Sequence, residues 1–419
     1  MSADKKSLPI FVTGGLDDEE EGLAMEKQHK MVRLQSPLRN VPSQRTLETL
    51  QTMLDNKPSV ARLTESLKHL SAPYERESKG QEDTIFELFK IPNRNEASIG
   101  RLLSVLKSFG LREDDPRFKG MMEKVREIEM EEEERSCEAH EQKHWKIEKE
   151  QFVECISSST DLIAKALQNE LVIPRWGKFV DSIRTIFNEC KQLTDGNVAT
   201  YIPQLARQDP LQWGMSICTV DGQRMSLGDS KAPFCVQSVS KAFNYAIAAS
   251  ELGADVVHSY VGQEPSGRFF NEICLDPKNK PHNPMVNSGA IVVTSLIKNK
   301  LDMADRFEHV LTEYRRIAGG EYIGFNNATF LSERSTADRN YALAYYMKVS
   351  ENHCFPPETT SLTDALDFYF QLCSVEGNCE SLSIMAATLA NGGVCPTTQE
   401  KCIDPQPTRD VLSLMYGII

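Results

Sequence analysis

Hydrophobic residues recur at three- and four-residue intervals through most of the chain after residue 80, and this spacing predicts amphipathic helices. In the first part of this region the pattern predicts helices at 83–89, 97–109, 116–134, 149–168 and 174–193. In the later part it predicts helices at 287–298, 304–318, 335–352, 361–373, 379–391 and 408–416. Residues 1–80 carry only short apolar clusters among polar residues, so we expect this segment to be largely disordered.

A segment between these helical regions has the pattern of a β-hairpin. Residues 211–220 are typical of a strand, Asp221-Gly222 is a favoured hairpin turn, and 223–227 supply the returning strand. The predicted fold class is therefore α+β and mainly helical, with a helical N-terminal domain at 81–196 and a second domain at 197–419. Helix pairs in the first domain are reminiscent of EF-hands. No segment has the alternating Asp/Asn loop with its central Gly and terminal Glu, so we predict no calcium site.

The segment 234–253 stands at the centre of the second domain's pattern. A short apolar lead-in meets Gln237-Ser238, and a helical pattern then runs from Val239 to a stop at Gly253. The stripe of positions that we expect to be buried consists of Val239, Ala242/Phe243, Ala246/Ile247 and Ser250. Lys241 is three residues beyond Ser238 and therefore one turn away on the same face. Because a desolvated lysine can take the proton of a serine hydroxyl, this pair is the candidate catalytic centre.

Composition narrows the classes of partner. The formal net charge of −13 argues against nucleic acid or an anionic membrane as the main partner, and small molecules or proteins fit better. No apolar run is long enough to span a bilayer. The eleven cysteines are irregularly spaced without a Cys-x-x-Cys pair, which favours a reducing compartment and no disulfide framework. The N-terminus lacks a signal-peptide core and is acidic near 17–21, which favours the cytosol.

A glutamate-rich run occupies 123–150, with eleven Glu against six Lys and Arg, and predicts a solvated helix or a flexible excursion. It contains His140-Glu-Gln-Lys-His144, a formal match to the zinc-peptidase pattern H-E-x-x-H. A working zinc site needs apolar flanks, a cleft and a third ligand, whereas the flanks here are strongly charged. We therefore predict no metal site.

Ser-x-x-Lys spacing by itself is weak evidence, because the chain contains four examples. They are Ser2/Lys5, Ser104/Lys107, Ser238/Lys241 and Ser295/Lys298. Only Ser238 has a hairpin, an apolar lead-in and a helix start in order, which is the arrangement of serine β-lactamases and penicillin-binding proteins.

Other segments, in order along the chain, extend this likeness to a family. They are 201–206, 220–224, 237–241, 264–267, 280–290, 330–334, 338–340, 368–374 and 385–393. Together they resemble the glutaminase family, most closely the animal kidney and liver types, over residues 83–416. The resemblance implies an EF-hand-like helical N-terminal domain followed by a glutaminase domain of the β-lactamase/penicillin-binding-protein type.

The resemblance also implies a reaction, the hydrolysis of L-glutamine to L-glutamate and ammonia. Ser238 would be the nucleophile and Lys241 its base. The residues that would line the glutamine pocket are Tyr201, Gln237, Asn287, Glu333, Asn340 and Tyr369. The family implies no cofactor or metal, phosphate as an activator, a homo-oligomer (dimer or tetramer) and a mitochondrial location, against which the N-terminus of this chain favours the cytoplasm.

The chemistry of the implied pocket is coherent. The α-ammonium group of glutamine matches a carboxylate such as Glu333, and its α-carboxylate and amide match neutral groups such as Asn287 and Asn340. The oxyanion formed by attack on the amide would meet backbone N–H groups at the start of the Ser238 helix.

Simpler structural roles remain open for most of these residues. Asn287 could cap the following helix, Glu333 could pair with Arg334 or Arg339, and Tyr369 could be core. Tyr245, one turn beyond Lys241, could orient the lysine, although we favour core packing.

The chain departs from the family pattern in three respects. Ala242 replaces a proline, which should alter rigidity and not chemistry. In the loop after 264–267, Glu272 and Cys274 replace a lysine and a phenylalanine, so activation by phosphate or by assembly should differ. The chain ends at Ile419, where the family continues with a proton-transfer tyrosine, three strands and a closing helix. We therefore expect a truncated domain whose sheet is reduced to one hairpin.

These observations leave competing hypotheses. The first is an oligomeric glutaminase with Ser238/Lys241 catalysis. The second is a catalytically inactive, truncated subunit that acts by pairing with full-length chains. The third, a different serine amidase or a penicillin-recognising protein, is disfavoured by the segments around Tyr201 and Asn287.

Overall fold

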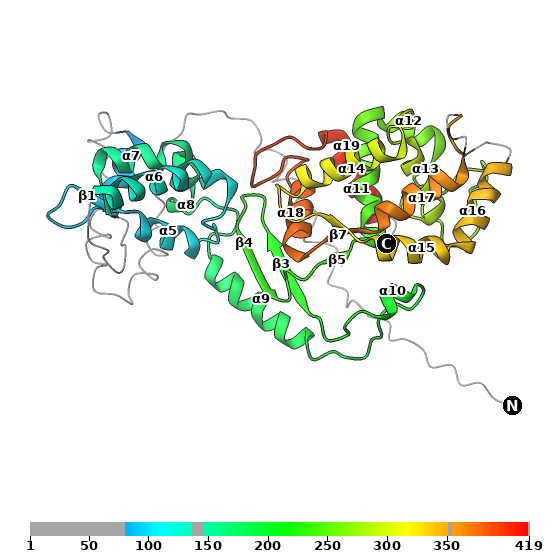
Figure 1. Cartoon of the computed structure of the whole chain (residues 1–419), viewed down its shortest axis with the longest axis horizontal. Coiled ribbons are helices and arrows are strands. Elements are labelled where there is room, and N and C mark those ends of the chain that lie inside the picture. Colours follow the sequence, from blue (N-terminus) through cyan, green and yellow to red (C-terminus); the bar gives the residue numbers. More distant parts are fainter. Residues whose placement is uncertain (1–79, 136–145, 351–353, 358, 360, 418–419) are drawn as a thin grey trace, which may run out of the picture. The chain divides into compact units, whose positions relative to one another are not determined.

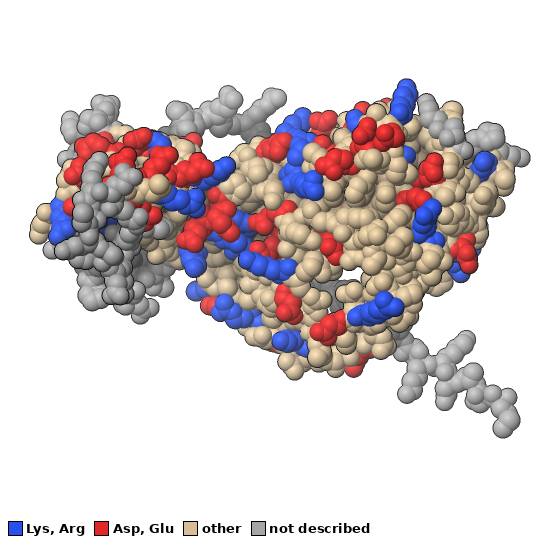
Figure 2. All heavy atoms as spheres, viewed as in Figure 1, with Lys and Arg blue, Asp and Glu red and all other residues tan. Residues whose placement is uncertain are grey.

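The computed structural model describes residues 80–135, 146–350, 354–357, 359 and 361–417, without the side chains of 132–135. All of them belong to one unit of the chain, 42–419. The predicted disorder of 1–80 and the His140–His144 motif lie outside the described residues. Among the described residues, no helix combines the length and apolarity that crossing a membrane requires. Acidic and basic side chains are interspersed on the face that Figure 2 shows.

The N-terminal region is helical, as predicted, and its helices are joined in part by a short antiparallel ladder. Its helices are α4 (Gln81–Phe89), α5 (Ile99–Ser108), α6 (Lys119–Arg135), α7 (Lys149–Ile156), α8 (Thr160–Leu167) and α9 (Trp176–Cys190). Strands β1 (Glu96–Ser98) and β2 (Lys146–Glu148) pair with Ala97 opposite Ile147. Phe86 and Phe152 meet edge to face in the core, with ring centroids 5.7 Å apart.

Two helix predictions in this region need correction. The predicted helix 97–109 starts as strand, because Ala97 and Ser98 pair in β1 and the Ser98 hydroxyl then caps α5 by accepting from Arg101 N. The predicted helix 149–168 is interrupted by a 3₁₀ turn, η2 (Ser157–Ser159), between α7 and α8. The run of serines in η2 hydrogen-bonds to nearby carbonyls, as in Ser157 Oγ to Glu154 O at 2.8 Å.

The predicted hairpin is confirmed. Strand β3 (Gly214–Cys218) pairs antiparallel with β4 (Arg224–Gly228), with Met215 opposite Leu227. Gly222 takes a φ of +80° in the turn, a conformation that favours glycine. In Figure 1 the hairpin lies between α9 and α18 (Cys379–Ala390), the two helices that pack against β4 and β3 respectively.

A second small sheet contradicts the expectation that the sheet is reduced to one hairpin. Strands β5 (Phe234–Cys235), β7 (Val375–Gly377) and β6 (Gly324–Phe325) form an antiparallel sheet in the order β5-β7-β6. Val236 N donates to Val375 O at 2.8 Å just beyond β5. This sheet fixes the lead-in to Ser238 through a strand that arrives from more than a hundred residues downstream.

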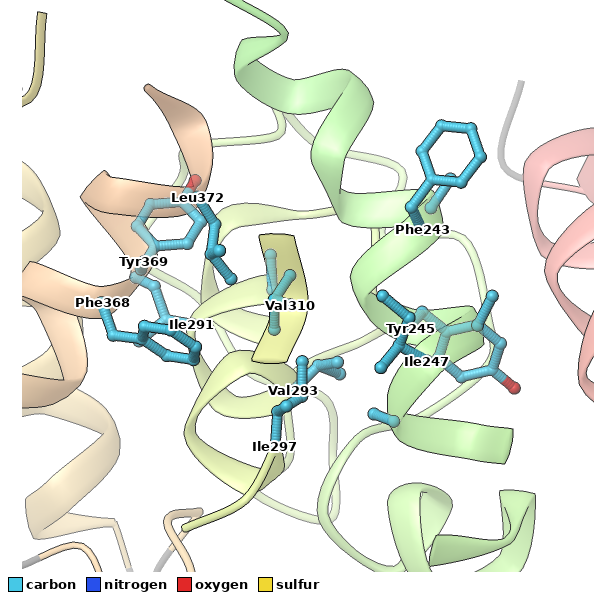
Figure 3. Close-up of a cluster of buried hydrophobic side chains, with 14 of the residues drawn as sticks. Phe243, Tyr245, Ile247, Ile291, Val293, Ile297, Val310, Phe368, Tyr369 and Leu372 are labelled. Atoms are coloured by element: carbon cyan, nitrogen blue, oxygen red, sulfur yellow. The ribbon is translucent and has the colours of Figure 1, made fainter. Parts of the chain in front are cut away.

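The second domain is built around the helix that begins beside Ser238. Its helices are α10 (Pro203–Ala206), α11 (Ser240–Leu252), α12 (Ala254–Tyr260), α13 (Asn287–Leu296), α14 (Met303–Ile317), α15 (Asn327–Ser335), α16 (Asp338–Val349), α17 (Leu362–Cys373), α18 (Cys379–Ala390) and α19 (Pro405–Gly417). Helix α11 contacts α13, α14 and α19. Figure 3 shows part of the apolar core between these helices, including Phe243, Ile291 and Val310.

The central helix differs from the prediction at its first turn. Residues Gln237–Val239 form a 3₁₀ turn, η3, and α11 starts only at Ser240. Val239, which the pattern placed in the buried stripe, is 51% exposed. The change from 3₁₀ to α geometry rotates this residue out of the stripe, because the two helices have different numbers of residues per turn. Ala242, Phe243, Ala246 and Ile247 are buried as predicted.

The turn of the hairpin is held by the N-terminal region. Gln223 is fully buried, and its Nε2 donates to Phe109 O (2.8 Å) and Ile173 O (3.1 Å) while its Oε1 accepts from Ile173 N (3.0 Å). Arg117 Nη1 donates to Asp221 O at 2.9 Å. The hairpin turn therefore satisfies backbone groups of the helical region that burial would otherwise leave unpaired.

Candidate active site

Ser238 and Lys241 lie in direct contact where η3 passes into α11. Lys241 Nζ is 2.6 Å from Ser238 Oγ. Ser238 is exposed, whereas Lys241 is only 3% exposed. Burial lowers the pKa of Lys241, and the negative charge of the nearby Glu333 opposes this effect. An exposed hydroxyl bonded to a buried amine of lowered pKa meets the requirement for a serine nucleophile with a lysine base.

Tyr201, Gln237 and Glu333 form a second group beside the serine. The Tyr201 hydroxyl lies 2.8 Å from Gln237 Oε1 and 3.2 Å from Glu333 Oε1. Helices α10, which follows Tyr201, and α15, which carries Glu333, pack together. Burial raises the pKa of Glu333, and the hydrogen bond from Tyr201 opposes the rise. Tyr201 thus links the Glu333 carboxylate to Gln237, the residue directly before Ser238.

Asn287 and Asn340 form a pair from two different helices. Asn287 is the first residue of α13, and its Nδ2 donates to Asn340 Oδ1, on α16, at 3.2 Å. The Asn287 Oδ1 atom is buried and has no hydrogen-bond partner. A buried acceptor without a partner is costly unless a ligand or water supplies the donor.

Phe270 connects the asparagine pair to the serine and lysine. Its carbonyl accepts from Asn287 N at 2.8 Å, and its ring centroid lies 5.8 Å from Lys241 Nζ. The ring is 58% exposed. Sequence analysis did not single out Phe270, although an aromatic pair within the polar loop 268–275 was a signal. In the same loop Glu272, one of the departures from the family pattern, pairs with Arg268 at 2.7 Å.

Tyr369 and Cys373 form the neutral inner wall of the site. Both are buried on α17, one turn apart, and burial raises the pKa of the Cys373 thiol to about 12. Burial also raises the pKa of Tyr369 well above its ordinary value. Both groups therefore stay protonated at neutral pH and add no charge beside Lys241. The four-residue spacing from Tyr369 was the sequence signal that could have pointed to Cys373.

The structure does not support the simpler roles that the sequence left open for Asn287 and for Glu333 with Arg334. Asn287 does not cap α13, because Val286 occupies the cap position without a side-chain bond. Glu333 is only 8% exposed, and its neighbour Arg334 pairs instead with Asp367 at 3.0 Å.

The tyrosines, by contrast, do belong to the core. Tyr369 lies in the hydrophobic cluster of Figure 3 at its border with the site. Tyr245 is fully buried, and its hydroxyl lies 2.8 Å from His258 Nε2, so its hydrogen-bond partner is this histidine and not Lys241.

The described residues contain no group of three or more His, Cys, Asp or Glu side chains that could hold a metal ion.

The fold and the site together define a class of protein. A mainly helical domain in which a short strand leads into a Ser-x-x-Lys helix start has the β-lactamase-like fold. Comparison with known proteins then specifies the family. The Glutaminase family matches residues 196–418, and the EF-hand domain family matches residues 81–174. The chain belongs to the glutaminase family, and its N-terminal region is an EF-hand domain.

Individual relatives agree with this assignment. The chain is 69% identical to putative glutaminase 2 of Caenorhabditis elegans over 91% of its own length and 63% of that protein. It is 47% identical to the mitochondrial liver isoform of glutaminase from Rattus norvegicus over 76% of its length and 51% of that protein. The chain therefore spans less than two thirds of these relatives. Among solved structures, the probable glutaminase ybaS matches with a TM-score of 0.52 and 32% identity, over 57% of this chain and 74% of that one.

Proposed function

We propose that this chain hydrolyses the side-chain amide of L-glutamine to L-glutamate and ammonia, with Ser238 as nucleophile and Lys241 as its base. The observation that carries the proposal is the 2.6 Å contact between Ser238 Oγ and the buried amine of Lys241. Burial keeps a larger fraction of this amine neutral than in water, and only the neutral amine can accept the serine proton. That the substrate is L-glutamine is inferred from the relatives reported above, which are named glutaminases.

The first half of the reaction forms an ester on the enzyme. Ser238 Oγ attacks the amide carbon of glutamine while its proton passes to Lys241 Nζ. We expect backbone N–H groups at the start of the helix beside Ser238 to stabilise the resulting oxyanion. The tetrahedral intermediate then collapses, the carbon–nitrogen bond breaks, and the proton on Lys241 passes to the leaving nitrogen, so that ammonia departs.

The second half regenerates the serine. A water molecule attacks the ester carbon and gives its proton to Lys241. The carbon–oxygen bond to Ser238 breaks, Ser238 takes the proton back, and glutamate leaves. Lys241 thus acts as base and acid in turn, which requires that it be neutral in the resting enzyme.

Recognition of glutamine requires opposite charge at one end and neutral partners at the other. The Glu333 carboxylate pairs with the α-ammonium group, and Tyr201 holds that carboxylate by its hydrogen bond. The unpaired Asn287 Oδ1 accepts from an N–H donor of the ligand, while Asn340 fixes the orientation of the Asn287 amide. Gln237 and Tyr369 complete the polar and apolar walls.

The test is ammonia release from L-glutamine by the purified chain. Ser238→Ala should abolish turnover, and Ser295→Ala, which changes the serine of another Ser-x-x-Lys match, should leave it intact. An active parent that loses activity only at Ser238 supports the proposal. A folded parent that releases no ammonia, and that instead co-purifies with a longer glutaminase chain, refutes it in favour of the inactive-subunit hypothesis.

The quaternary structure, activator and compartment follow from the family resemblance as further proposals. We expect a homo-oligomer, stimulation by phosphate and no requirement for a cofactor. Light scattering at several protein concentrations tests the homo-oligomer, and ammonia release with and without phosphate tests the stimulation. Imaging of the tagged chain distinguishes a mitochondrial from a cytoplasmic location.

A further inference from the structure

We propose that Ser240 is a positioning residue for the Ser238 nucleophile, because its hydroxyl holds the backbone of Gln237 in a left-handed turn. This inference rests on the proposed function of Ser238. Ser240 lies between the two residues of the catalytic pair, is fully buried, and contacts no solvent. Neither its burial nor its bond is needed for the Ser-x-x-Lys spacing itself.

The backbone of Gln237 has an unusual conformation. Its φ is +47°, in the left-handed region that residues with a Cβ rarely adopt. Residues in this conformation persist only where surrounding contacts compensate for the strain, and they cluster at functional sites. The turn lies directly before Ser238 and therefore determines the direction in which the Ser238 side chain leaves the backbone.

Ser240 supplies the compensating contact. Its Oγ donates to Gln237 O at 2.6 Å, and its backbone N–H also points to Gln237 O. The carbonyl of Gln237 is thus held by both the hydroxyl and the backbone N–H of Ser240. On the outer side, Tyr201 OH holds the Gln237 side chain at 2.8 Å.

Ser240 is fixed in turn from the core. Tyr314 on α14 is fully buried, and its hydroxyl lies 2.7 Å from Asn244 Oδ1 and 3.2 Å from Ser240 O. Because the Tyr314 hydroxyl has a single proton, its contact with Ser240 is shared and weaker than the direct bond to Gln237. The chain of contacts runs from Tyr314 through Ser240 to Gln237, and ends at the 2.6 Å contact between Ser238 and Lys241.

The expected consequence is kinetic. Misplacement of a reacting group by about 1 Å can cost about a hundredfold in rate. Without the Ser240 hydroxyl, Gln237 can relax toward an ordinary φ, and Ser238 Oγ then moves away from Lys241. The substrate pocket keeps Glu333 and Asn287, so KM should change little while kcat falls.

Ser295 offers a matched control. It is also a buried serine on a helix, and its Oγ donates to the carbonyl three residues back, Val292 O, at the same 2.6 Å. Ser240→Ala and Ser295→Ala therefore each remove one such bond, and both should lower thermal stability; Ser240→Ala also removes a contact with the Cys373 thiol. Only Ser240→Ala changes the turn before the nucleophile.

The experiment compares the parent, Ser240→Ala, Tyr314→Phe and Ser295→Ala in the complete chain. The first measurement is the rate at which a fluorophosphonate, an electrophile that phosphonylates activated serine hydroxyls, labels Ser238, followed by mass spectrometry. The second is kcat and KM for glutamine. We expect labelling and kcat to fall about tenfold to a hundredfold in Ser240→Ala, by less in Tyr314→Phe, and not at all in Ser295→Ala. A crystal structure of Ser240→Ala should place Gln237 outside the left-handed region.

Each other outcome decides against the inference. If Ser240→Ala labels at the parent rate, or slows no more than Ser295→Ala, Ser240 has only a structural role. If the parent labels at Ser238 but releases no ammonia from glutamine, the proposed function fails alone and the labelling comparison still tests Ser240. If the parent does not label at Ser238, the nucleophile and its positioning residue are both refuted.

Discussion

At the scale of single residues, the burial of the ionisable groups of Lys241 and Glu333 lowers the stability of the folded chain. Lys241 has its pKa lowered because its amine is removed from water, and Glu333 has its pKa raised for the same reason. Each group is therefore less stable in its charged form in the folded chain than in the unfolded chain. Functional sites commonly carry such strain, and the rest of the fold compensates for it.

Replacing Lys241 should expose this strain directly. For a lysine whose pKa in the folded state lies below the ordinary 10.5, the unfolded chain binds more protons between the two values, so stability rises with pH there. Lys241→Met removes the penalty, and should raise the midpoint of thermal unfolding at neutral pH while abolishing turnover. The gain over the parent should shrink as the pH approaches 10.5. Thermal melts across pH test this.

The exposed Lys231 provides the control for this prediction. Lys231→Met should leave the melting midpoint and the turnover close to those of the parent. A lower midpoint for Lys241→Met than for the parent at neutral pH would contradict the argument, because it would mean that the buried amine stabilises the fold.

Glu333 should govern substrate affinity and its pH dependence. As the pH falls through its raised pKa, Glu333 becomes neutral and loses its attraction for the α-ammonium group, so KM should rise toward acid. Glu333→Gln should raise KM about tenfold to a hundredfold, in line with the loss of a charge-assisted hydrogen bond, and remove this acid limb. The rise of kcat with pH, which reports Lys241, should remain.

Steady-state kinetics between acid and neutral pH distinguish the rise of KM toward acid, which reports Glu333, from the rise of kcat with pH, which reports Lys241. Glu308→Gln is a suitable control, because Glu308 is an exposed carboxylate paired only with Arg315 at 3.3 Å. A loss of kcat with unchanged KM in Glu333→Gln would assign this carboxylate to the chemical step instead.

At the scale of elements, the hairpin turn should be the most sensitive part of the sheet. Gln223→Ala would leave the buried carbonyl of Phe109 and the part-buried carbonyl and N–H of Ile173 without their partner, a loss of about 2–3 kcal/mol in the free energy of unfolding. Gln208→Ala is the control, because Gln208 is exposed and makes one local bond to Gln204 O. Urea unfolding of both variants measures the difference. Equal losses would show that the hairpin turn is not held by Gln223.

The elements also show how far the sequence can predict this fold. The fold class, the hairpin and the long helices were predicted correctly, because each has a local signal: an Asp-Gly turn, an apolar stripe or a glycine stop. Helix α15 was missed because its apolar residues follow no clear stripe, although Asn326 caps it by accepting from Thr329 N. The sheet β5-β7-β6 was missed because strands of two or three residues are defined only by their distant partners.

The candidate site likewise contains residues that the sequence could predict and residues that it could not. Spacing pointed to Ser238 and Lys241, and family resemblance added the pocket residues. Their role in binding stays a prediction, although Tyr201 bonds to Gln237 and Glu333, and Asn287 bonds to Asn340. Ser240 and Phe270 could not be found from spacing, because their contacts depend on the left-handed turn at Gln237 and on a loop that folds back to Asn287.

At the scale of the whole molecule, the EF-hand domain and the glutaminase domain share buried polar groups. Arg224 in β4 is buried, and it pairs with Asp114 of the N-terminal region at 3.5 Å and with Glu321 of its own domain at 2.7 Å. Arg112 pairs with Glu380 on α18 at 2.9 Å. Breaking one partner of such a pair leaves the other charge without compensation. The N-terminal domain therefore acts as a brace for the hairpin, which as an isolated two-stranded ribbon is only marginally stable.

Removal of the brace should loosen the hairpin before the core. In the fragment 197–419, Arg224 N loses its bond to Gly110 O (2.8 Å) and Asp221 O loses its bond from Arg117. Hydrogen–deuterium exchange at 219–224 should therefore be faster in this fragment than in the complete chain, while α11 and α13, whose contacts lie within the second domain, keep slow exchange. Equal exchange at 219–224 in the two proteins would mean that the packing of β3 on α18 is sufficient to hold the turn. Faster exchange in α11 as well would mean that the brace extends to the helix that carries Lys241, and turnover by the fragment should then fall in proportion.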